Sequence, residues 1–339
     1  MKSAILVRPR EIELRDVGVP KAPPGGLVVR VRAALTDGTD LKAYRRGHPQ
    51  MPMPTPFGHE FSGDVAAVGE GVTKFAEGQA LMSVHSAPCM QCFWCGNGEE
   101  ELCTSVMSTK ILGAYAEYIE IPAHIAAINA YAKPAHLSYV AAAFLEPLAC
   151  VVHSVEMLAP KAGARVLVMG DGGFGFLHAL VLKGIGAEPM LAGRRDERAA
   201  LAQRYGLPYL DVRKDDLLKI VHEVTQARGT DALVECTGQA EVWERGPQLV
   251  RRGGTVSFFG GLPSGTRVSF DAARMHYDEV RLISPFHFRP SSVRRAYDML
   301  ASGEIDPLPL VTETVPLAEI ARVFERLDAG DGIKFAVTP

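Results

Sequence analysis

The chain has 339 residues, of which 47% are hydrophobic and 22% charged, and its formal net charge is −3. A single hydrophobic core stops growing at roughly 250–300 residues, so we expect two domains. Nothing in the charge balance indicates a disordered chain, nucleic-acid binding or a strongly anionic partner. Residues 1–10 lack a signal-peptide pattern, and no uninterrupted apolar run reaches the ~20 residues of a membrane span. We therefore expect a cytoplasmic protein with no nucleic-acid or membrane partner.

Three regions differ in their pattern. Residues 1–150 are rich in glycine and proline and contain short β-like runs such as 27–33 and 63–68, which indicates an irregular β-rich domain. Residues 151–288 alternate apolar strands with helical segments, which predicts a parallel sheet covered by helices, an α/β domain. Its strands are expected at 164–169, 190–192, 232–235 and 255–259, and its helices at 174–185 and 196–205. The last fifty residues return to a helix at 293–301 and to strand-like pieces that end at 333–337.

Four of the six cysteines form a dense cluster, namely Cys89, Cys92, Cys95 and Cys103. In a reducing compartment this spacing favours one tetrahedral zinc ion held by four thiolates, a closed structural site. Four free cysteines or two disulfides are the alternatives. A nucleic-acid zinc module is a further rival, but the segment contains glutamates at 99–101 and no arginine or lysine.

A glycine-rich turn follows the apolar strand at 164–169 and leads into a helix. Its glycines, Gly170, Gly172, Gly173 and Gly175, fit a dinucleotide fingerprint. In that fingerprint the first glycine makes the turn, the second lets the backbone approach a pyrophosphate, and the last lets helix and strand pack closely. The pyrophosphate would lie at the helix N-terminus, where free amides favour an anion. A purely structural glycine turn is the alternative.

The end of the next strand discriminates between cofactors. An acid there would accept the ribose 2′-hydroxyl of NAD, but the chain reads Gly193, Arg194 and Arg195, with no carboxylate until Asp196. Gly193 leaves room for a 2′-phosphate, and the two arginines can pair with it by charge-assisted hydrogen bonds. We therefore expect NADP(H) in preference to NAD(H). Two solvated arginines that open a helix would look the same.

Together, the cysteine spacing, the Gly58-His59-Glu60 motif and the glycine-rich turn resemble the zinc-dependent medium-chain dehydrogenases over nearly the whole chain. The resemblance implies a GroES-like β-rich catalytic domain at 1–150 and 289–339, with a structural zinc lobe at about 86–106. It implies a Rossmann domain, with a doubly wound parallel sheet, at 151–288. Relatives are dimers or tetramers, so we expect a homo-oligomer and favour a tetramer.

The resemblance also implies a catalytic zinc ion. Asp37 stands where the family usually has a cysteine ligand, as in some glucose dehydrogenases, and His59, Glu60 and Glu146 match the other ligand positions. A carboxylate is an acceptable zinc ligand, although a harder one than a thiolate. The alternative is that the metal has been lost and that Asp37 only caps a helix or turn.

Further roles follow from the same resemblance. Asp40 matches the residue that accepts the second ring N–H of His59, Thr39 matches the hydroxyl that contacts the substrate alcohol, and Lys42 is a candidate for passing the proton to water. The polar segment 42–48 favours a hydroxylated substrate. Candidate contacts to the cofactor after later strands are Thr237, Gly238 and Gly260.

The sequence therefore predicts hydride transfer between a secondary alcohol, or a sugar or polyol hydroxyl, and NADP(H). A metal-poor NADPH-dependent reductase and a non-catalytic NADPH-binding sensor are the alternatives.

Overall fold

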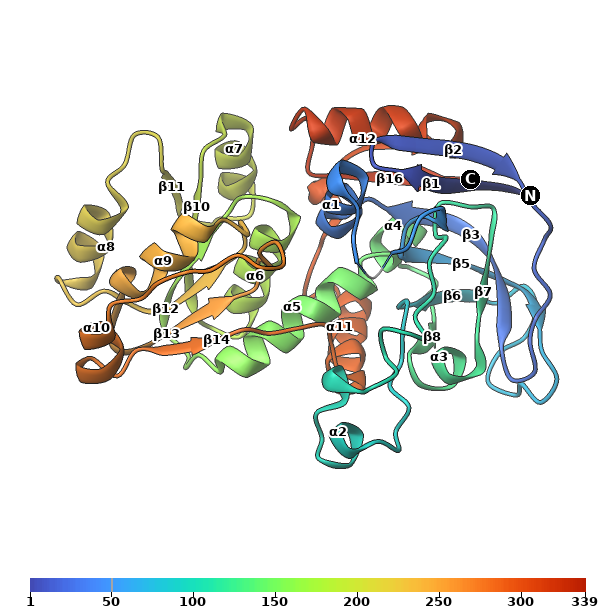
Figure 1. The fold of residues 1–339 in the computed structure, drawn as a ribbon, viewed down its shortest axis with the longest axis horizontal. Coiled ribbons are helices and arrows are strands. Elements are labelled where there is room, and N and C mark those ends of the chain that lie inside the picture. Colours follow the sequence, from blue (N-terminus) through green and yellow to red (C-terminus); the bar gives the residue numbers. More distant parts are fainter. Residues whose placement is uncertain (50) are drawn as a thin grey trace. The chain divides into compact units, whose positions relative to one another are not determined.

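The computed structural model describes residues 1–49 and 51–339. The chain forms two compact units (Figure 1). The first contains Met1–Ala149 and Phe288–Pro339, and the second contains Cys150–His287. The predicted combination of a β-rich domain and a parallel α/β domain is confirmed.

The first unit is built on a seven-stranded sheet and a three-stranded sheet. The larger sheet has the order β15-β16-β3-β5-β6-β8, with β7 paired to β3, and the smaller has the order β2-β1-β4. The strands are Lys2–Arg8 (β1), Glu11–Asp16 (β2), Leu27–Leu35 (β3), Thr55–Pro56 (β4), Glu60–Val68 (β5), Ala80–Ser83 (β6), Tyr118–Ile121 (β7), Ala130–Ala132 (β8), Val311–Pro316 (β15) and Lys334–Thr338 (β16). The helices are Gly38–Arg46 (α1), Phe93–Gly96 (α2), Ala123–Ile128 (α3), Tyr139–Ala142 (α4), Pro290–Ser302 (α11) and Ile320–Asp328 (α12), with short 3₁₀ turns at Glu100–Leu102, Leu308–Leu310 and Leu317–Glu319.

An aromatic cluster joins the helices of this unit to its sheets. Phe324 of α12 lies with its ring centroid 4.9 Å from that of Phe57, 5.5 Å from Tyr44 of α1 and 5.9 Å from Tyr115. Each of these side chains is at least 95% buried, and full burial of such a group contributes about 1.5–3 kcal/mol. The cluster fixes α1 and Tyr115, which carry parts of the site described below.

The second unit is a single parallel sheet with the order β11-β10-β9-β12-β13-β14. Its strands are Arg165–Met169 (β9), Glu188–Gly193 (β10), Tyr209–Asp211 (β11), Thr230–Glu235 (β12), Val250–Phe258 (β13) and Arg281–Ile283 (β14). Its helices are Gly173–Gly184 (α6), Asp196–Arg204 (α7), Leu217–Thr225 (α8), Ala240–Leu249 (α9) and Ala272–Tyr277 (α10). The order reverses beside β9, so the carboxyl ends of β9, β10 and β12 meet at the switch point where doubly wound sheets bind ligands.

Helix α5 (Leu145–Leu158) contains the boundary between the two units. The stretch Tyr139–Leu158 is long and apolar enough to be compared with a membrane span, but 78% of it is buried inside the structure. It also carries Glu146 and His153, both buried. Such burial is typical of a core helix.

Candidate functional site

Asp37 ends the loop after β3 and caps α1. Its Oδ2 accepts a hydrogen bond from the Thr39 amide at 2.7 Å, so the helix-capping role weighed for this residue is real. Its other oxygen, Oδ1, is buried and has no hydrogen-bond partner in the described part of the chain. Burial raises the pKa of Asp37, but Lys334 and His59 outweigh it and hold that pKa below its usual value. Asp37 is therefore a buried carboxylate whose Oδ1 accepts no hydrogen bond from the described residues.

His59 stands just before β5, and the carboxylate of Asp40 fixes its ring. Its Nδ1 lies 2.9 Å from Asp40 Oδ1, and Asp40 Oδ2 accepts a hydrogen bond from the Tyr115 hydroxyl at 2.7 Å. Nε2 then faces Asp37 Oδ2 at 3.7 Å and Glu146 Oε2 at 4.0 Å. A histidine held at one nitrogen by a carboxylate presents the other nitrogen to a ligand, which is the arrangement common at metal centres.

Glu60, the first residue of β5, is held by a cation that the sequence analysis did not single out. Lys334 of β16 donates to both carboxylate oxygens at 2.6 Å and to the Thr36 carbonyl at 2.8 Å. Glu60 and Lys334 are both buried. Burial lowers the pKa of Lys334, but the carboxylates of Glu60 and Asp37 outweigh it and hold that pKa above its usual value. The expected ligand Glu60 thus forms a buried ion pair.

Glu146, at the start of α5, meets a histidine that the sequence analysis missed. His85 follows β6, and its Nδ1 lies 3.3 Å from Glu146 Oε1, which leaves Oε2 turned toward His59. The His85 ring packs edge-on against His59, with centroids 5.0 Å apart, and against Phe288 at 5.8 Å. Burial raises the pKa of Glu146, but His85 and His59 outweigh it and hold it low. No motif surrounds His85, so only the fold reveals it.

These donors fit a divalent cation. One ligand atom each from Asp37, His59 and Glu60 lies within 4.8 Å of the others, and all three residues are buried. Oδ1 of Asp37 accepts no hydrogen bond from the described residues and lies 4.0 Å from Lys334 Nζ. One imidazole and several carboxylates form a donor set that zinc accepts.

The remaining predicted residues of this region lie on α1. Thr39 is half-buried, and its hydroxyl also bonds to Asp37 and helps to lower the pKa of that carboxyl. Lys42 is half-buried one turn further on. Arg45, taken from the sequence as part of a polar entrance, instead donates to Asp328 of α12 at 2.5 Å. It therefore faces the scaffold, because α1 packs against α12.

The cysteine lobe brings its four sulfur atoms together. The Sγ atoms of Cys89, Cys92, Cys95 and Cys103 all lie within 4.8 Å of one another. The amides of Cys95 and Thr104 lower the pKa of Cys92 to about 6, which favours its thiolate. All six cysteines lie in the described part of the chain, and none of them forms a disulfide. This arrangement fits the tetrahedral thiolate site that zinc prefers.

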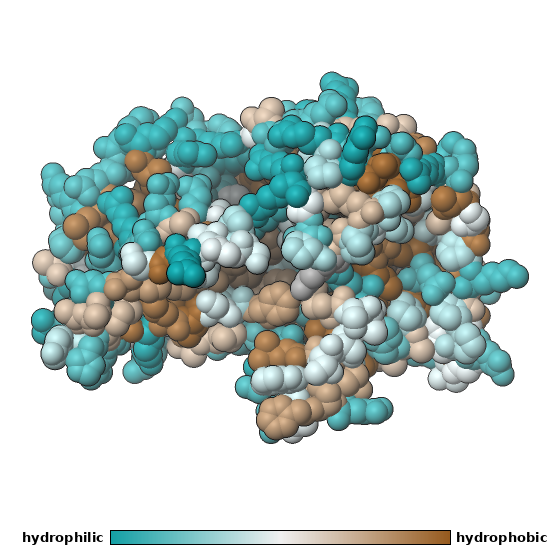
Figure 2. All heavy atoms as spheres, viewed as in Figure 1, coloured by the Kyte–Doolittle hydropathy of each residue, from teal (hydrophilic) through white to brown (hydrophobic). Residues whose placement is uncertain are grey.

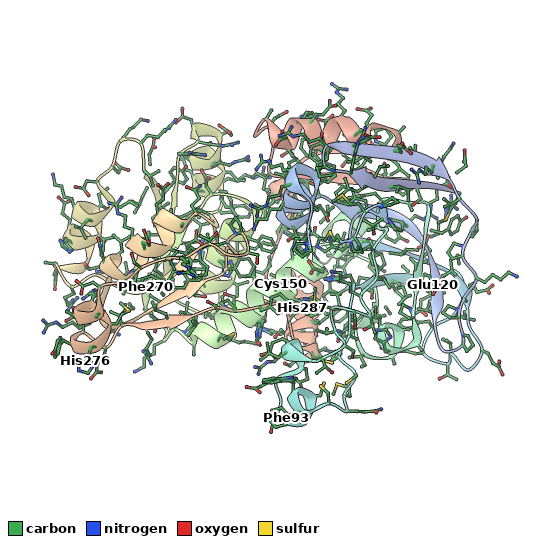
Figure 3. All side chains as sticks on the ribbon, in the orientation of Figure 1. Phe93, Glu120, Cys150, Phe270, His276 and His287 are labelled. Atoms are coloured by element: carbon green, nitrogen blue, oxygen red, sulfur yellow. The ribbon has the colours of Figure 1, made fainter. Side chains whose placement is uncertain are left out.

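The lobe is anchored on one side and apolar on the other. Arg289 donates to both oxygens of the buried Glu101, at 2.6 and 2.7 Å. Phe93, at the tip, is 72% exposed, and hydrophobic atoms gather there (Figures 2 and 3).

The glycine-rich turn of the second unit connects β9 to α6. Gly170 has φ of +112°, which favours glycine, and a Cβ on Gly175 would lie 1.8 Å from the Gly170 carbonyl oxygen. A Cβ on Gly172 would meet nothing within 4 Å, so its surface is open to a ligand. Gly173 begins α6. The turn thus has the tight bend, the open face and the close packing of a pyrophosphate-binding loop.

The end of β10 differs from the sequence prediction in one respect. A Cβ on Gly193 would lie 2.2 Å from Asp171 Oδ2, so the space expected for a phosphate beside this glycine is taken by a side chain. The Arg194 amide donates to the same Asp171 oxygen at 3.0 Å. The Arg194 side chain is exposed, and that of Arg195 is 33% exposed.

A buried glutamate organises the next strand end. Glu235 accepts hydrogen bonds from the amides of Thr237, at 2.5 Å, and Gly238, at 3.0 Å. A Cβ on Gly260 would lie 2.4 Å from the Gly238 amide nitrogen and 2.6 Å from Glu235. The three predicted contacts Thr237, Gly238 and Gly260 therefore lie together at one edge of the sheet, around an acid that the sequence analysis did not assign.

Comparison with known proteins agrees with this architecture. Residues 23–130 match the alcohol dehydrogenase GroES-like domain, and residues 173–302 match the zinc-binding dehydrogenase domain. The L-threonine 3-dehydrogenase of Bacillus licheniformis is 30% identical over 332 residues, covering 95% of this chain and 94% of that protein. The sorbitol dehydrogenase of Halalkalibacterium halodurans is 27% identical over 94% of each chain.

Solved structures extend the likeness to the whole chain. A zinc-binding dehydrogenase from Sinorhizobium meliloti 1021, bound to NADP, has a TM-score of 0.91 and 31% identity and covers 100% of this chain and 99% of its own. Alcohol dehydrogenase TADH from Thermus sp. ATN1 has a TM-score of 0.90 and 25% identity, covering 100% of this chain and 99% of its own. The chain belongs to the zinc-dependent medium-chain dehydrogenases.

Proposed function

We propose that this chain transfers hydride between a secondary alcohol, polyol or sugar hydroxyl and NADP(H), with zinc held by Asp37, His59 and Glu146. The observation that carries the proposal is the buried carboxylate of Asp37, whose Oδ1 accepts no hydrogen bond from the described residues and whose Oδ2 lies 3.7 Å from Nε2 of His59. Three protein ligands leave a fourth position for the substrate oxygen. We leave Glu60 out of this set, because Lys334 engages both of its oxygens.

Bound zinc would supply a Lewis acid that lowers the pKa of a substrate hydroxyl. The residues of the chain prepare this chemistry. Asp40 accepts from His59 Nδ1 and fixes the tautomer in which Nε2 is the ligand, and the Tyr115 hydroxyl keeps Asp40 in place. Thr39 offers a hydroxyl beside Asp37 through which the substrate proton leaves, and Lys42 passes it to water.

The nucleotide preference rests on Arg194 and Arg195. Their cationic side chains follow β10, where the 2′ position of the adenosine ribose is recognised in such sheets. The NADP bound to the Sinorhizobium meliloti relative supports this choice. Arg194→Asp combined with Arg195→Leu should weaken NADP binding at least about tenfold more than NAD binding, since charge-assisted bonds to phosphate are lost. Equal losses for the two cofactors would remove the basis for NADP.

The substrate class rests on the polar metal site and on relatives named for polyols, such as sorbitol dehydrogenase. Because no disulfide joins its described cysteines, we also place the chain in the cytoplasm. From the family resemblance we expect a tetramer or dimer, which sedimentation equilibrium would distinguish.

Metal counting combined with a turnover panel tests the proposal. We expect about two zinc ions per chain, one in each site, and turnover of polyols or sugars in preference to simple alcohols. His59→Ala and Glu146→Ala should each abolish turnover and leave one zinc ion in the cysteine lobe. Glu120→Ala, on the exposed face of β7, is the matched control and should keep its turnover and about two zinc ions per chain (Figure 3).

Two outcomes would replace the proposal. Full turnover with a single zinc ion would favour a metal-poor reductase. Tight NADPH binding without turnover of any substrate would favour a sensor.

A further inference from the structure

The glycine-rich turn carries an acid whose role lies outside the phosphate-binding motif. Asp171 stands between Gly170 and Gly172, yet its side chain points to the end of the neighbouring strand β10. Its Oδ2 accepts hydrogen bonds from the Arg194 amide at 3.0 Å and from the Tyr209 hydroxyl at 2.8 Å. The Tyr209 oxygen in turn accepts from the Arg195 amide at 3.0 Å. The carboxylate is therefore fixed in place by two other segments of the unit, the end of β10 and β11.

This position is the one at which doubly wound sheets usually carry the acid that accepts the ribose 2′-hydroxyl of NAD. That acid normally comes from the end of the second strand itself. Here the strand ends in Gly193, and its missing side chain makes the room that Asp171 fills. The fold thus restores, from another turn, a carboxylate that the strand sequence lacks.

Charges of both signs therefore meet at the end of β10. Arg194 and Arg195 follow the strand, and Arg198 lies buried in the first turn of α7. Burial, with a contribution from Arg195, lowers the pKa of Arg198, and Asp171 opposes this shift. A 2′-phosphate entering here would be attracted by the arginines and repelled by Asp171. A 2′-hydroxyl could donate to the same carboxylate.

We propose that Asp171 sets the cofactor preference of this enzyme by holding a carboxylate at the ribose 2′ position, which favours NAD and limits the advantage that the arginines give to NADP. The inference rests on the proposed use of NADP, because it assumes that Arg194 and Arg195 receive the phosphate. It predicts an enzyme that accepts both cofactors, with a preference tuned by one side chain.

Asp171→Asn is the direct test. Asparagine keeps a carbonyl oxygen that can accept from the Arg194 amide and the Tyr209 hydroxyl, so only the charge is removed. The dissociation constants of NADP⁺ and NAD⁺, and of the probes 2′,5′-ADP and 5′-AMP, are measured by calorimetry on the full chain. The ratio of NADP⁺ to NAD⁺ affinity should rise at least roughly tenfold, because one unit charge about 4 Å from another changes an affinity by about fivefold in water and by several hundredfold near a protein surface. Asp171→Ser, also uncharged, should shift the ratio in the same direction.

Asp196→Asn is the matched control. Asp196 also lies beside Arg195, but it pairs with Arg213 and its side chain is 81% exposed. The ratio of NADP⁺ to NAD⁺ affinity in Asp196→Asn should therefore change less than about threefold. An unchanged or lowered ratio in both Asp171 variants would overturn the inference. The Arg194/Arg195 variant separates the proposed NADP preference from the proposed role of Asp171. If this variant bound NADP as tightly as the unchanged chain, the proposed NADP preference would be wrong, but the affinity ratios measured for the Asp171 variants would still report on Asp171.

Discussion

Replacing Lys334 by methionine is the most demanding test of the first unit. Lys334 Nζ lies 2.6 Å from both oxygens of Glu60, and the two residues are 3% and 0% exposed. Methionine fills a similar volume, but it leaves a buried carboxylate without its cation. Removing one partner of such a pair costs about 3–5 kcal/mol. For a domain of 150–250 residues, that corresponds to a fall in Tm of roughly 6–20 °C.

Thermal unfolding followed by circular dichroism measures this loss. Lys2→Met is the matched control, because Lys2 forms an equally short pair with Asp16, at 2.7 Å, but on the surface. It should lower Tm by only about 1–2 °C, since exposed pairs contribute little and are screened. A drop in Tm for Lys334→Met no larger than that of the control would refute the reasoning.

A second substitution separates charge from packing. Glu60→Gln added to Lys334→Met removes the unpaired charge, so the double variant should regain about 1–3 kcal/mol of the loss. If packing of the lysine stem were the main contribution, the double variant would be no more stable than Lys334→Met. Zinc titration of Lys334→Met is a further readout, because a released Glu60 should act as an additional ligand and tighten binding.

Three further predictions concern single histidines and one anchor. Burial lowers the pKa of His178 to about 4, so His178 binds fewer protons in the folded than in the unfolded state. The free energy of unfolding of the second unit, measured by urea titration, should therefore fall by about 2 kcal/mol between pH 7 and pH 5. His178→Gln should remove this pH dependence. His85→Ala removes the 3.3 Å contact of His85 with Oε1 of Glu146 and should weaken cobalt or zinc binding about 10–100-fold. Unchanged affinity would show that His85 does not orient this ligand. Glu101→Gln breaks the paired bonds to Arg289 and should speed zinc release from the cysteine lobe to a chelator, whereas equal rates would mean that the thiolates alone hold the lobe.

Local pattern accounts for much of the fold. The parallel sheet follows from alternating strands and helices, and the strand expected at 232–235 is observed as Thr230–Glu235. The strand expected at 255–259 is observed as Val250–Phe258, because Val250 pairs with Thr230 of β12 before an irregularity, and regular pairing resumes at Thr255 opposite Ala232. Strand beginnings of this kind depend on the neighbouring strand and have no local signal.

The site could be predicted only where a motif carries it. His59 and Glu60 belong to a recognisable tripeptide, but the partner of Glu60, Lys334, is 274 residues away in sequence. His85 is a lone histidine whose meaning depends on α5 bringing Glu146 to it. Asp171 lies inside the glycine motif, yet the direction of its side chain depends on the absence of one at Gly193. In each case the missing information is a contact between distant segments.

The capping role accounts for only one oxygen of Asp37. Oδ2 caps α1, and Oδ1 accepts no hydrogen bond from the described residues. Serine or asparagine would cap equally well without burying a charge. Four carboxylates are buried in this region, those of Asp37, Asp40, Glu60 and Glu146. The ammonium group of Lys334 offsets one of these negative charges, that of Glu60. Buried carboxylates that repel one another are expected to lose their charge unless cations compensate. A divalent cation bound at Asp37, His59 and Glu146, as proposed above, would supply that compensation, which a capping residue alone would not need.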